Sequence, residues 1–172
     1  MAGTRISQGV RLGQDSKGFV RRACPVCARH FKIIARAPES LVVHVVFSSL
    51  LAHANVDELA GLPLRWCPYC GHRAQADVFL TKPQRSYIEA CARSVAGQVR
   101  FEQLRQATGR LRDNPYITFL AVRPAEPELD PPAEPDDMTA VFLLCCGEEM
   151  KIKPTWKEAL LCHHCRAGQP AE

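Results

Sequence analysis

Eight of the nine cysteines in this 172-residue chain stand in four close pairs, and thiols at such spacing either bind metal or exchange disulfides. Three pairs have the spacing C-x-x-C, the fourth is vicinal, and Cys91 stands alone. The first twenty residues lack the apolar run of a secretory signal, so we expect a cytoplasmic, reducing environment in which paired cysteines bind metal. An extracellular disulfide framework is the alternative. The pairs are Cys24/Cys27, Cys67/Cys70, Cys145/Cys146 and Cys162/Cys165.

The first two pairs together supply the four thiolates of a tetrahedral zinc site. Each begins Cys-Pro, where proline fixes φ early in a tight turn, and Gly71 permits a positive φ after the second pair. These knuckles resemble those of the zinc-ribbon, or rubredoxin-like, proteins, over about ten residues and their short flanking strands. The 39 residues between the pairs make this a ribbon with a long insertion. We therefore predict zinc on Cys24, Cys27, Cys67 and Cys70.

The C-terminal pairs predict a second ribbon, in which one knuckle is compressed to vicinal cysteines. Adjacent side chains diverge in an extended strand, so both thiols bind one ion only if the backbone turns sharply, as Gly147 permits. The expected ligands are Cys145, Cys146, Cys162 and Cys165. In the alternative, His163 or His164 replaces one cysteine, since imidazole also binds zinc.

A redox function is a minor alternative. The tetrapeptide Cys67-Pro-Tyr-Cys70 is similar to the active site of the glutaredoxins, where the motif opens an amphipathic helix that lowers the pKa of the first thiol. The residues that follow here, 71–77, show no apolar helical period. Three separate thiol pairs also suit metal better than one catalytic dithiol.

Short strands are expected to carry the knuckles. Val20–Cys24 and Phe31–Ala35 predict a hairpin around the first pair. The β-branched run Leu41–Phe47 indicates a buried strand, although it could instead begin a helix through 54. Asn55–Glu58 has the pattern of a capping box and predicts a short helix.

A long helix is predicted from Thr81, which forms a second capping box with Gln84, to about Gly109. Its expected buried face consists of residues spaced three, four and four positions apart, namely Ile88, Cys91, Val95 and Val99. Trp66 and Trp156 each lie near a knuckle and are expected to cover a metal site.

Charge and proline content divide the chain. Residues 124–137 contain five prolines and six carboxylates and predict an extended linker. The expected α+β organisation is a flexible basic arm at 1–19, a body at 20–123 with zinc-ribbon hairpins and one long helix, this linker, and a second zinc ribbon at 138–172.

Function follows from the metal and the surface. Zinc held by four cysteines has no open position, so the two predicted zinc ions are structural and the chain is expected not to be an enzyme. Eight basic residues against one acidic in 1–36, and the arginines of the helix, favour weak binding to nucleic-acid phosphate. The alternative is a protein-interaction adaptor within a larger complex. No membrane span or small-molecule substrate is expected. The predicted phosphate contacts are Arg21, Arg22, Arg29, Lys32, Arg93, Arg100 and Arg105.

Overall fold

The computed structural model describes residues 4–35, 41–47, 55–56, 63–109, 122–123 and 129–170. These residues form short antiparallel strands and one long helix, which confirms the predicted α+β class. The chain divides into two compact units. One comprises Met1–Val10, Val42–Glu58 and Tyr87–Asp130, and the other Arg11–Leu41, Leu59–Ser86 and Pro131–Glu172. Within the described part of the chain, no helix has the length and apolar character needed to cross a membrane.

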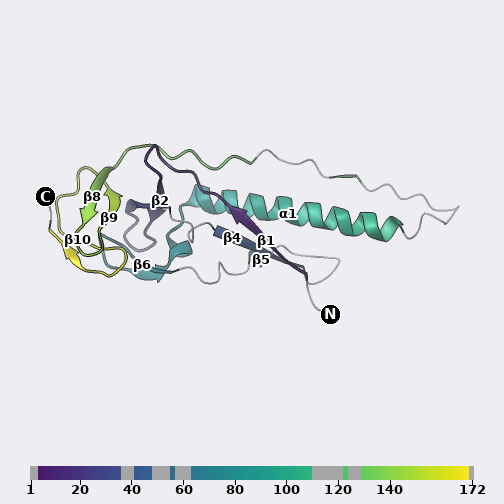
Figure 1. Cartoon of the computed structure of the whole chain (residues 1–172), viewed down its shortest axis with the longest axis horizontal. Helices are drawn as coiled ribbons and strands as arrows, with labels where there is room; N and C mark the ends of the chain where they lie inside the picture. Colours follow the sequence, from purple (N-terminus) through teal and green to yellow (C-terminus); the bar gives the residue numbers. More distant parts are fainter. Residues whose placement is uncertain are drawn as a thin grey trace. The chain divides into compact units, whose positions relative to one another are not determined.

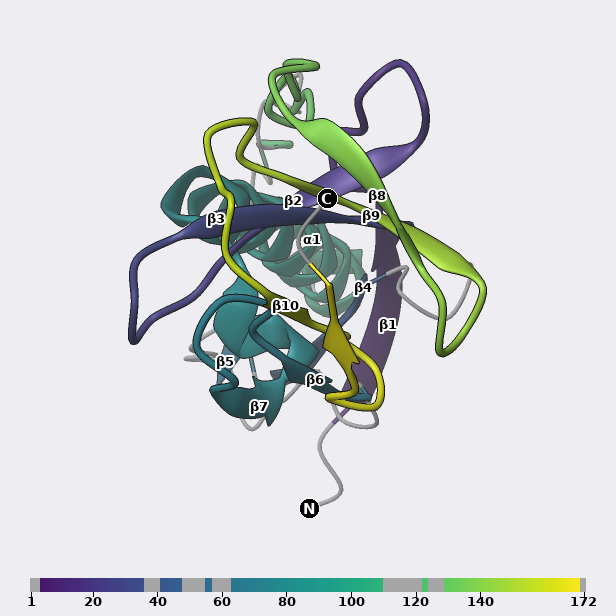
Figure 2. The same cartoon turned by 90° about the vertical axis from the view of Figure 1, so that its left-hand side faces the viewer.

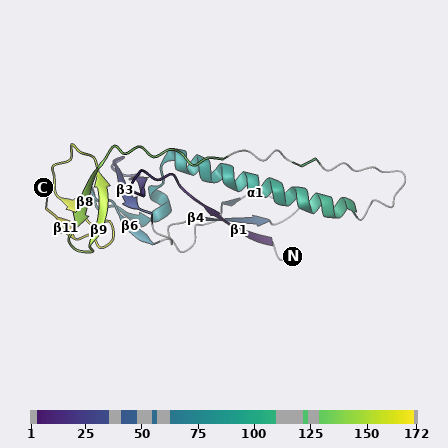
Figure 3. The same ribbon diagram turned by 45° about the horizontal axis from the view of Figure 1, so that its top comes forward.

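The first unit contains a three-stranded sheet of order β1-β4-β5, of which Figure 3 labels β1 and β4. Its strands are β1 (Thr4–Val10), β4 (Leu41–Phe47) and β5 (Asn55–Val56). The strand interpretation of 41–47 is therefore confirmed, while 48–54 lie outside the described residues. The segment 1–19 was predicted to be a flexible arm, but it contains β1.

The predicted helix start at Asn55 is wrong. Asn55 and Val56 pair with Val46 and Val45 of β4 as an antiparallel strand. A capping box is a local signal, and backbone pairing with a strand elsewhere in the sequence overrides it here.

The helix α1 (Lys82–Gly109) has the predicted bounds, and Figure 1 shows it as one continuous coil. The capping box is confirmed: Thr81 N–H donates to Gln84 Oε1 at 2.9 Å, and Gln84 N–H donates to Thr81 Oγ1 at 3.4 Å. Of the predicted apolar face, Ile88 is buried, whereas Cys91, Val95 and Val99 are only half-buried. Residues 102–107 are exposed.

The second unit is built on a four-stranded antiparallel sheet of order β2-β3-β9-β8 (Figure 2). Its strands are β2 (Phe19–Ala23), β3 (His30–Ile34), β8 (Thr139–Leu143) and β9 (Glu148–Ile152). The first two confirm the predicted hairpin. The segment from residue 138 was expected to form a separate ribbon, but β9 pairs with β3 in one sheet. Pairing between segments so distant in sequence leaves no local signal.

Two smaller hairpins complete this unit. They are β6 (Leu64–Trp66) with β7 (Arg73–Gln75), followed by the 3₁₀ turn η2 (Ala76–Phe79), and β10 (Leu160–Leu161) with β11 (Gly168–Gln169).

Two apolar clusters hold these hairpins together. One gathers Phe31 and Phe79 around the buried thiols of the first cysteine group, and the other gathers Leu143, Met150 and Leu160. Tyr69, from the Cys67–Cys70 turn, packs against both clusters. Its hydroxyl donates to the carbonyl of His30 (2.8 Å) and accepts the N–H of Lys153 (3.1 Å). This tyrosine therefore joins the two halves of the unit.

Candidate metal centres

Four turns of the second unit share one backbone geometry. In each, the N–H of the fifth residue donates to the carbonyl of the first at 2.8–3.0 Å. The fifth residue always has a positive φ, between 56° and 71°, a conformation that suits glycine and strains other residues. Because the turn closes in the same way each time, the first and fourth side chains are equivalent in all four. The turns, called knuckles below, are 24–29, 67–72, 143–148 and 162–167.

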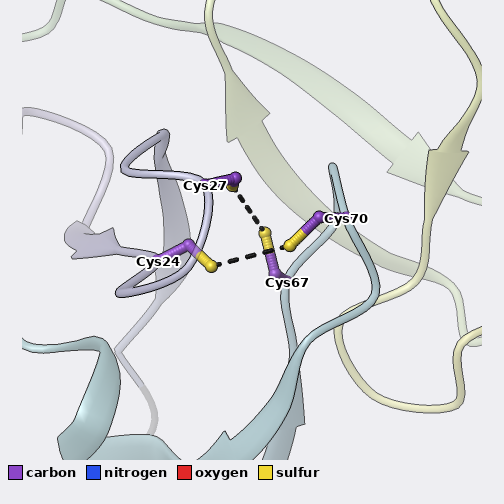
Figure 4. A group of neighbouring side chains, drawn as sticks. All are labelled: Cys24, Cys27, Cys67 and Cys70. Atoms are coloured by element: carbon purple, nitrogen blue, oxygen red, sulfur yellow. Dashed lines mark hydrogen bonds between the residues drawn. The ribbon is translucent and has the colours of Figure 1, made fainter.

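The first two knuckles bring their four cysteines together. Figure 4 shows Cys24 and Cys27, from the turn between β2 and β3, facing Cys67 and Cys70 from the turn between β6 and β7. The Sγ atoms of Cys24 and Cys70 lie 3.7 Å apart, as do those of Cys27 and Cys67. Zinc–sulfur bonds of about 2.3 Å place tetrahedral sulfurs about 3.8 Å apart. The spacing therefore fits four ligands of one ion, and all nine cysteines are free thiols.

Burial makes these thiols poor acids in the absence of a cation. Cys24 is 1% exposed and Cys67 is fully buried, and loss of water raises the pKa of both thiols. Burial also acts to raise the pKa of Cys27, but hydrogen bonds, led by the backbone N–H of Arg29, lower it. Several neighbouring thiolates need a divalent cation to neutralise them, and a tetrahedral metal supplies that charge.

The remaining knuckles assemble a second cysteine group. Ligand atoms of Cys145, Cys146 and Cys162 all lie within 4.8 Å of one another, and the Sγ atoms of Cys146 and Cys162 are 3.7 Å apart. Loss of water around its Sγ and the nearby thiols of Cys162 and Cys165 raise the pKa of Cys145 to about 12. Three of the four predicted cysteines therefore meet at ligand distance, and the fourth, Cys165, lies near enough to act on the Cys145 thiol. The group is compatible with a metal ion, as the sequence predicted.

The vicinal pair has a structural explanation that the sequence analysis missed. In the knuckle 143–148, Leu143 occupies the first position, where the other three knuckles have cysteine. Leu143 is fully buried in the apolar cluster, Cys146 takes the fourth position, and Cys145 lies between them. Cys145 therefore provides the thiol that Leu143 lacks. Gly147, at the same position as Gly71, is the signal in the sequence that could have revealed this register.

The two histidines of the fourth knuckle lie beside the second group, outside its thiol cluster. His164 Nδ1 lies 2.7 Å from Arg65 Nη1, which can only donate, so Nε2 carries the proton and donates to Glu148 at 2.9 Å. His163 is buried, with its Nε2 3.8 Å from the same carboxylate. His164 is thus held in a hydrogen-bonded chain that favours the four-cysteine ligand set.

The two cysteine groups lie on topologically equivalent scaffolds. The N–H of Trp66 donates to the carbonyl of His163, and the N–H of Leu161 donates to the carbonyl of Pro68, both at 2.9 Å. In each of these two knuckles the donor is the residue before the first cysteine, and the acceptor is the residue after it. The contact between the knuckles is therefore reciprocal. This is the arrangement of a tandem pair of similar hairpin units.

The tryptophans lie near the knuckles, as predicted. Trp156 packs against the second apolar cluster and contacts Tyr69 edge-to-face, with ring centroids 4.9 Å apart. Trp66 lies against the guanidinium groups of Arg73 and Arg166, each 5.1 Å from its ring centroid.

Three of the predicted phosphate contacts are buried or paired with the chain's own carboxylates. Arg22 is 3% exposed and Lys32 is fully buried, so neither side chain reaches an external phosphate. Arg21 pairs with Glu134 at 2.9 Å and with Asp137. The carboxylates of the acidic segment neutralise this side of the sheet, although the sequence suggested a free basic surface.

The other four predicted contacts are exposed. Arg29 lies over the ring of Trp156 at 4.7 Å. On α1, Arg93 and Arg105 are exposed and pair with Glu89 (3.9 Å) and Glu102 (2.9 Å). Arg100 is also exposed.

The glutaredoxin-like motif lacks the helix that its resemblance requires. Cys67–Cys70 forms the turn between β6 and β7, and Cys67 is fully buried. A nucleophilic thiol needs an accessible position and a depressed pKa, whereas the Cys67 thiol is buried and its pKa is raised.

No family model, curated protein or solved structure matches this chain. The sites alone therefore define its class, a protein with two cysteine groups, on paired β-hairpin knuckles, that are able to hold metal.

Proposed function

We propose that both cysteine groups bind zinc and that the chain is a zinc-ribbon protein with two structural ions. The Sγ–Sγ spacing of 3.7 Å, which recurs in both groups, carries this proposal. Four thiolates fill the coordination sphere of zinc and leave no position for water or substrate, so the role is structural and not catalytic. Structural zinc contributes about 10–16 kcal/mol of apparent binding free energy at pH 7, enough to order such short hairpins.

Metal analysis of the purified chain tests the proposal. We expect two zinc ions per chain in a reduced sample, and iron in their place only under heterologous expression, since a four-thiolate tetrahedron also suits iron. Serine at Cys24 or Cys67 should remove one ion, whereas serine at Cys91, which belongs to neither group, should remove none. Retention of two ions in the Cys67→Ser chain would refute the assignment of the first site.

We further propose that the tandem ribbon acts as a protein-interaction module. Its hairpins are held by two metal sites, and its basic residues Arg21 and Lys32 are paired with the chain's own carboxylates. That pairing favours a role in which these cations recognise acidic groups of protein once the chain's own carboxylates have left them. Binding of a synthetic acidic peptide to the full chain tests this role.

Nucleic-acid binding through α1 is the second candidate, favoured by the exposure of Arg93, Arg100 and Arg105. Phosphate contacts release counterions, so log affinity should fall with log salt at a slope of about −0.9 per duplex phosphate contacted. Three arginines predict a slope of about −3. Alanine at all three should abolish binding to duplex DNA at low salt, with lysine at the same positions as the control that retains it. Absence of any binding at about 50 mM salt would eliminate this candidate.

A further inference from the structure

Two lysines lie face to face in the centre of the four-stranded sheet. Lys32 of β3 is directly opposite Lys151 of β9. Their side chains are 0% and 2% exposed. Asp15 Oδ2 lies between them, 3.4 Å from Lys32 Nζ and 2.7 Å from Lys151 Nζ.

This arrangement is costly unless an anion is present. Like charges directly opposite each other destabilise a strand pair, and each buried ammonium group loses its hydration. A protein with apolar side chains of similar size at such positions is often as stable as one with buried charges, or more stable. Lys32 and Lys151 both lie eight residues after the first position of their knuckles, so both hairpins bring a cation to the same place. The pair therefore forms a site for negative charge.

Asp15 is a fixed part of this site. Its Oδ1 accepts the N–H groups of Lys17 (3.0 Å) and Phe19 (3.1 Å), which anchor the carboxylate to its own turn. One carboxylate cannot neutralise two lysines together with the adjacent Arg21. About two more negative charges must come from elsewhere.

The acidic segment 134–137 supplies them. Glu134 lies 2.9 Å from both Lys32 Nζ and Arg21 Nε, and Asp137 lies 3.2 Å from Lys32 Nζ. Asp136 pairs with Lys151, and the carbonyl of Pro135 accepts from Lys32. Residues 131–137 belong to neither a helix nor a strand. Carboxylates and one carbonyl thus connect an extended segment to the lysines.

We propose that Lys32, Lys151 and Arg21 form a binding site for an extended acidic peptide of a partner protein, and that residues 134–137 are its internal ligand. The side chains of Asp136 and Asp137 are 41% and 50% exposed, so the outer side of the segment faces solvent. A peptide with carboxylates at similar spacing satisfies the same cations when the segment leaves. This inference names the partner class of the interaction module proposed above and rests on that proposal.

A tethered ligand competes at an effective concentration in the millimolar range, so binding in trans is measurable only once the tether is weakened. The test uses the full chain with the substitutions Glu134→Gln, Asp136→Asn and Asp137→Asn, and a synthetic peptide of residues 131–138 as the probe. We expect the triple variant to bind this peptide at least about tenfold more tightly than the unaltered chain. Because the contacts are ionic, raising salt from about 50 to 500 mM should weaken binding.

Matched controls separate charge at this site from charge in general. The chain with Glu149→Gln and Glu158→Gln loses exposed carboxylates outside the segment and should behave as the unaltered chain. A peptide with glutamine and asparagine in place of its acidic residues should not bind. If the triple variant fails to fold, the milder Asp136→Asn, Asp137→Asn chain replaces it, because these two side chains are the exposed ones.

Zinc content is measured in the same samples, so that the two proposals fail separately. A variant with two zinc ions and unchanged circular dichroism that does not bind the peptide would overturn the inference and leave a purely structural ion cluster. Tighter binding of inorganic phosphate or of an oligonucleotide than of the peptide would also overturn it. Absence of zinc from the unaltered chain would instead overturn the metal proposal.

Discussion

Lys32 and Lys151 lie opposite each other at a shared register between β3 and β9, and this pairing fuses two cysteine-bearing hairpins into one sheet. The reciprocal hydrogen bonds of Trp66 and Leu161 join the two smaller hairpins in the same way. The two cysteine groups thus lie on one continuous scaffold.

A chain cut within 124–137 should therefore lose stability, contrary to the separate ribbon expected from the sequence. Residues 1–123 lack β9 and expose the edge of β3, including the buried Ile33, which pairs with Met150. We expect a lower denaturation midpoint and a broader transition in urea. A fragment that unfolds at the midpoint of the full chain would show that the sheet pairing contributes little.

The second centre should depend on its vicinal thiols. Cys146→Ser should remove one zinc ion, as should Cys145→Ser, because Leu143 occupies the position of the missing fourth thiol. His164→Ala should retain both ions, since His164 bonds Arg65 and Glu148 instead. Native mass spectrometry distinguishes these results. The reverse pattern would indicate a site with three cysteines and one histidine.

The second centre should also release its metal first. Cys145, Cys146 and Cys165 are exposed, whereas in the first centre only Cys70 is. Exposed thiolates are more accessible to a chelator and to protons. A chromogenic chelator should therefore remove one ion quickly and the other slowly, and Cys146→Ser should abolish the fast phase. Loss of the slow phase in that variant would reverse the assignment.

Acid should destabilise the sheet through Asp15. Burial acts to raise its pKa, but hydrogen bonds from Lys151, two backbone N–H groups and Lys32 together lower it to about 2. Because the pKa of this carboxyl is lower in the folded than in the unfolded chain, the ionised carboxylate stabilises the fold at pH values above its unfolded pKa. That stabilisation disappears as pH falls from about 4 to 2. Asp15→Asn should remove about 2 kcal/mol at neutral pH. It should also flatten this part of the stability profile, as urea unfolding at several pH values would show. An unchanged profile in the variant would contradict the role of Asp15.

Local signals predicted the elements that local contacts determine. The Thr81–Gln84 box marked the start of α1, and the Cys24–Cys27 spacing marked the hairpin that carries it, because both depend on residues within one turn. Asn55 was misinterpreted, since its pairing with Val46 lies outside any capping pattern.

Long-range relations could not be predicted. The burial of Lys32 depends on Lys151 and Glu134, more than 100 residues away, so its charge indicated a surface residue. Leu143 at a cysteine position was hidden because its knuckle is defined by hydrogen bonds and not by residue type. The structure brings together seven of the eight paired thiols in two groups, which the sequence could indicate because the ligands of a metal site have a characteristic spacing.

The metal content of the reduced, folded chain tests the central claim most directly. Elemental analysis combined with thiol counting should give two zinc ions per chain and no disulfides, because 3.7 Å between thiol sulfurs fits zinc and exceeds the S–S bond of about 2.05 Å. A folded sample with fewer than about 1.5 zinc ions per chain would contradict the account of two metal centres.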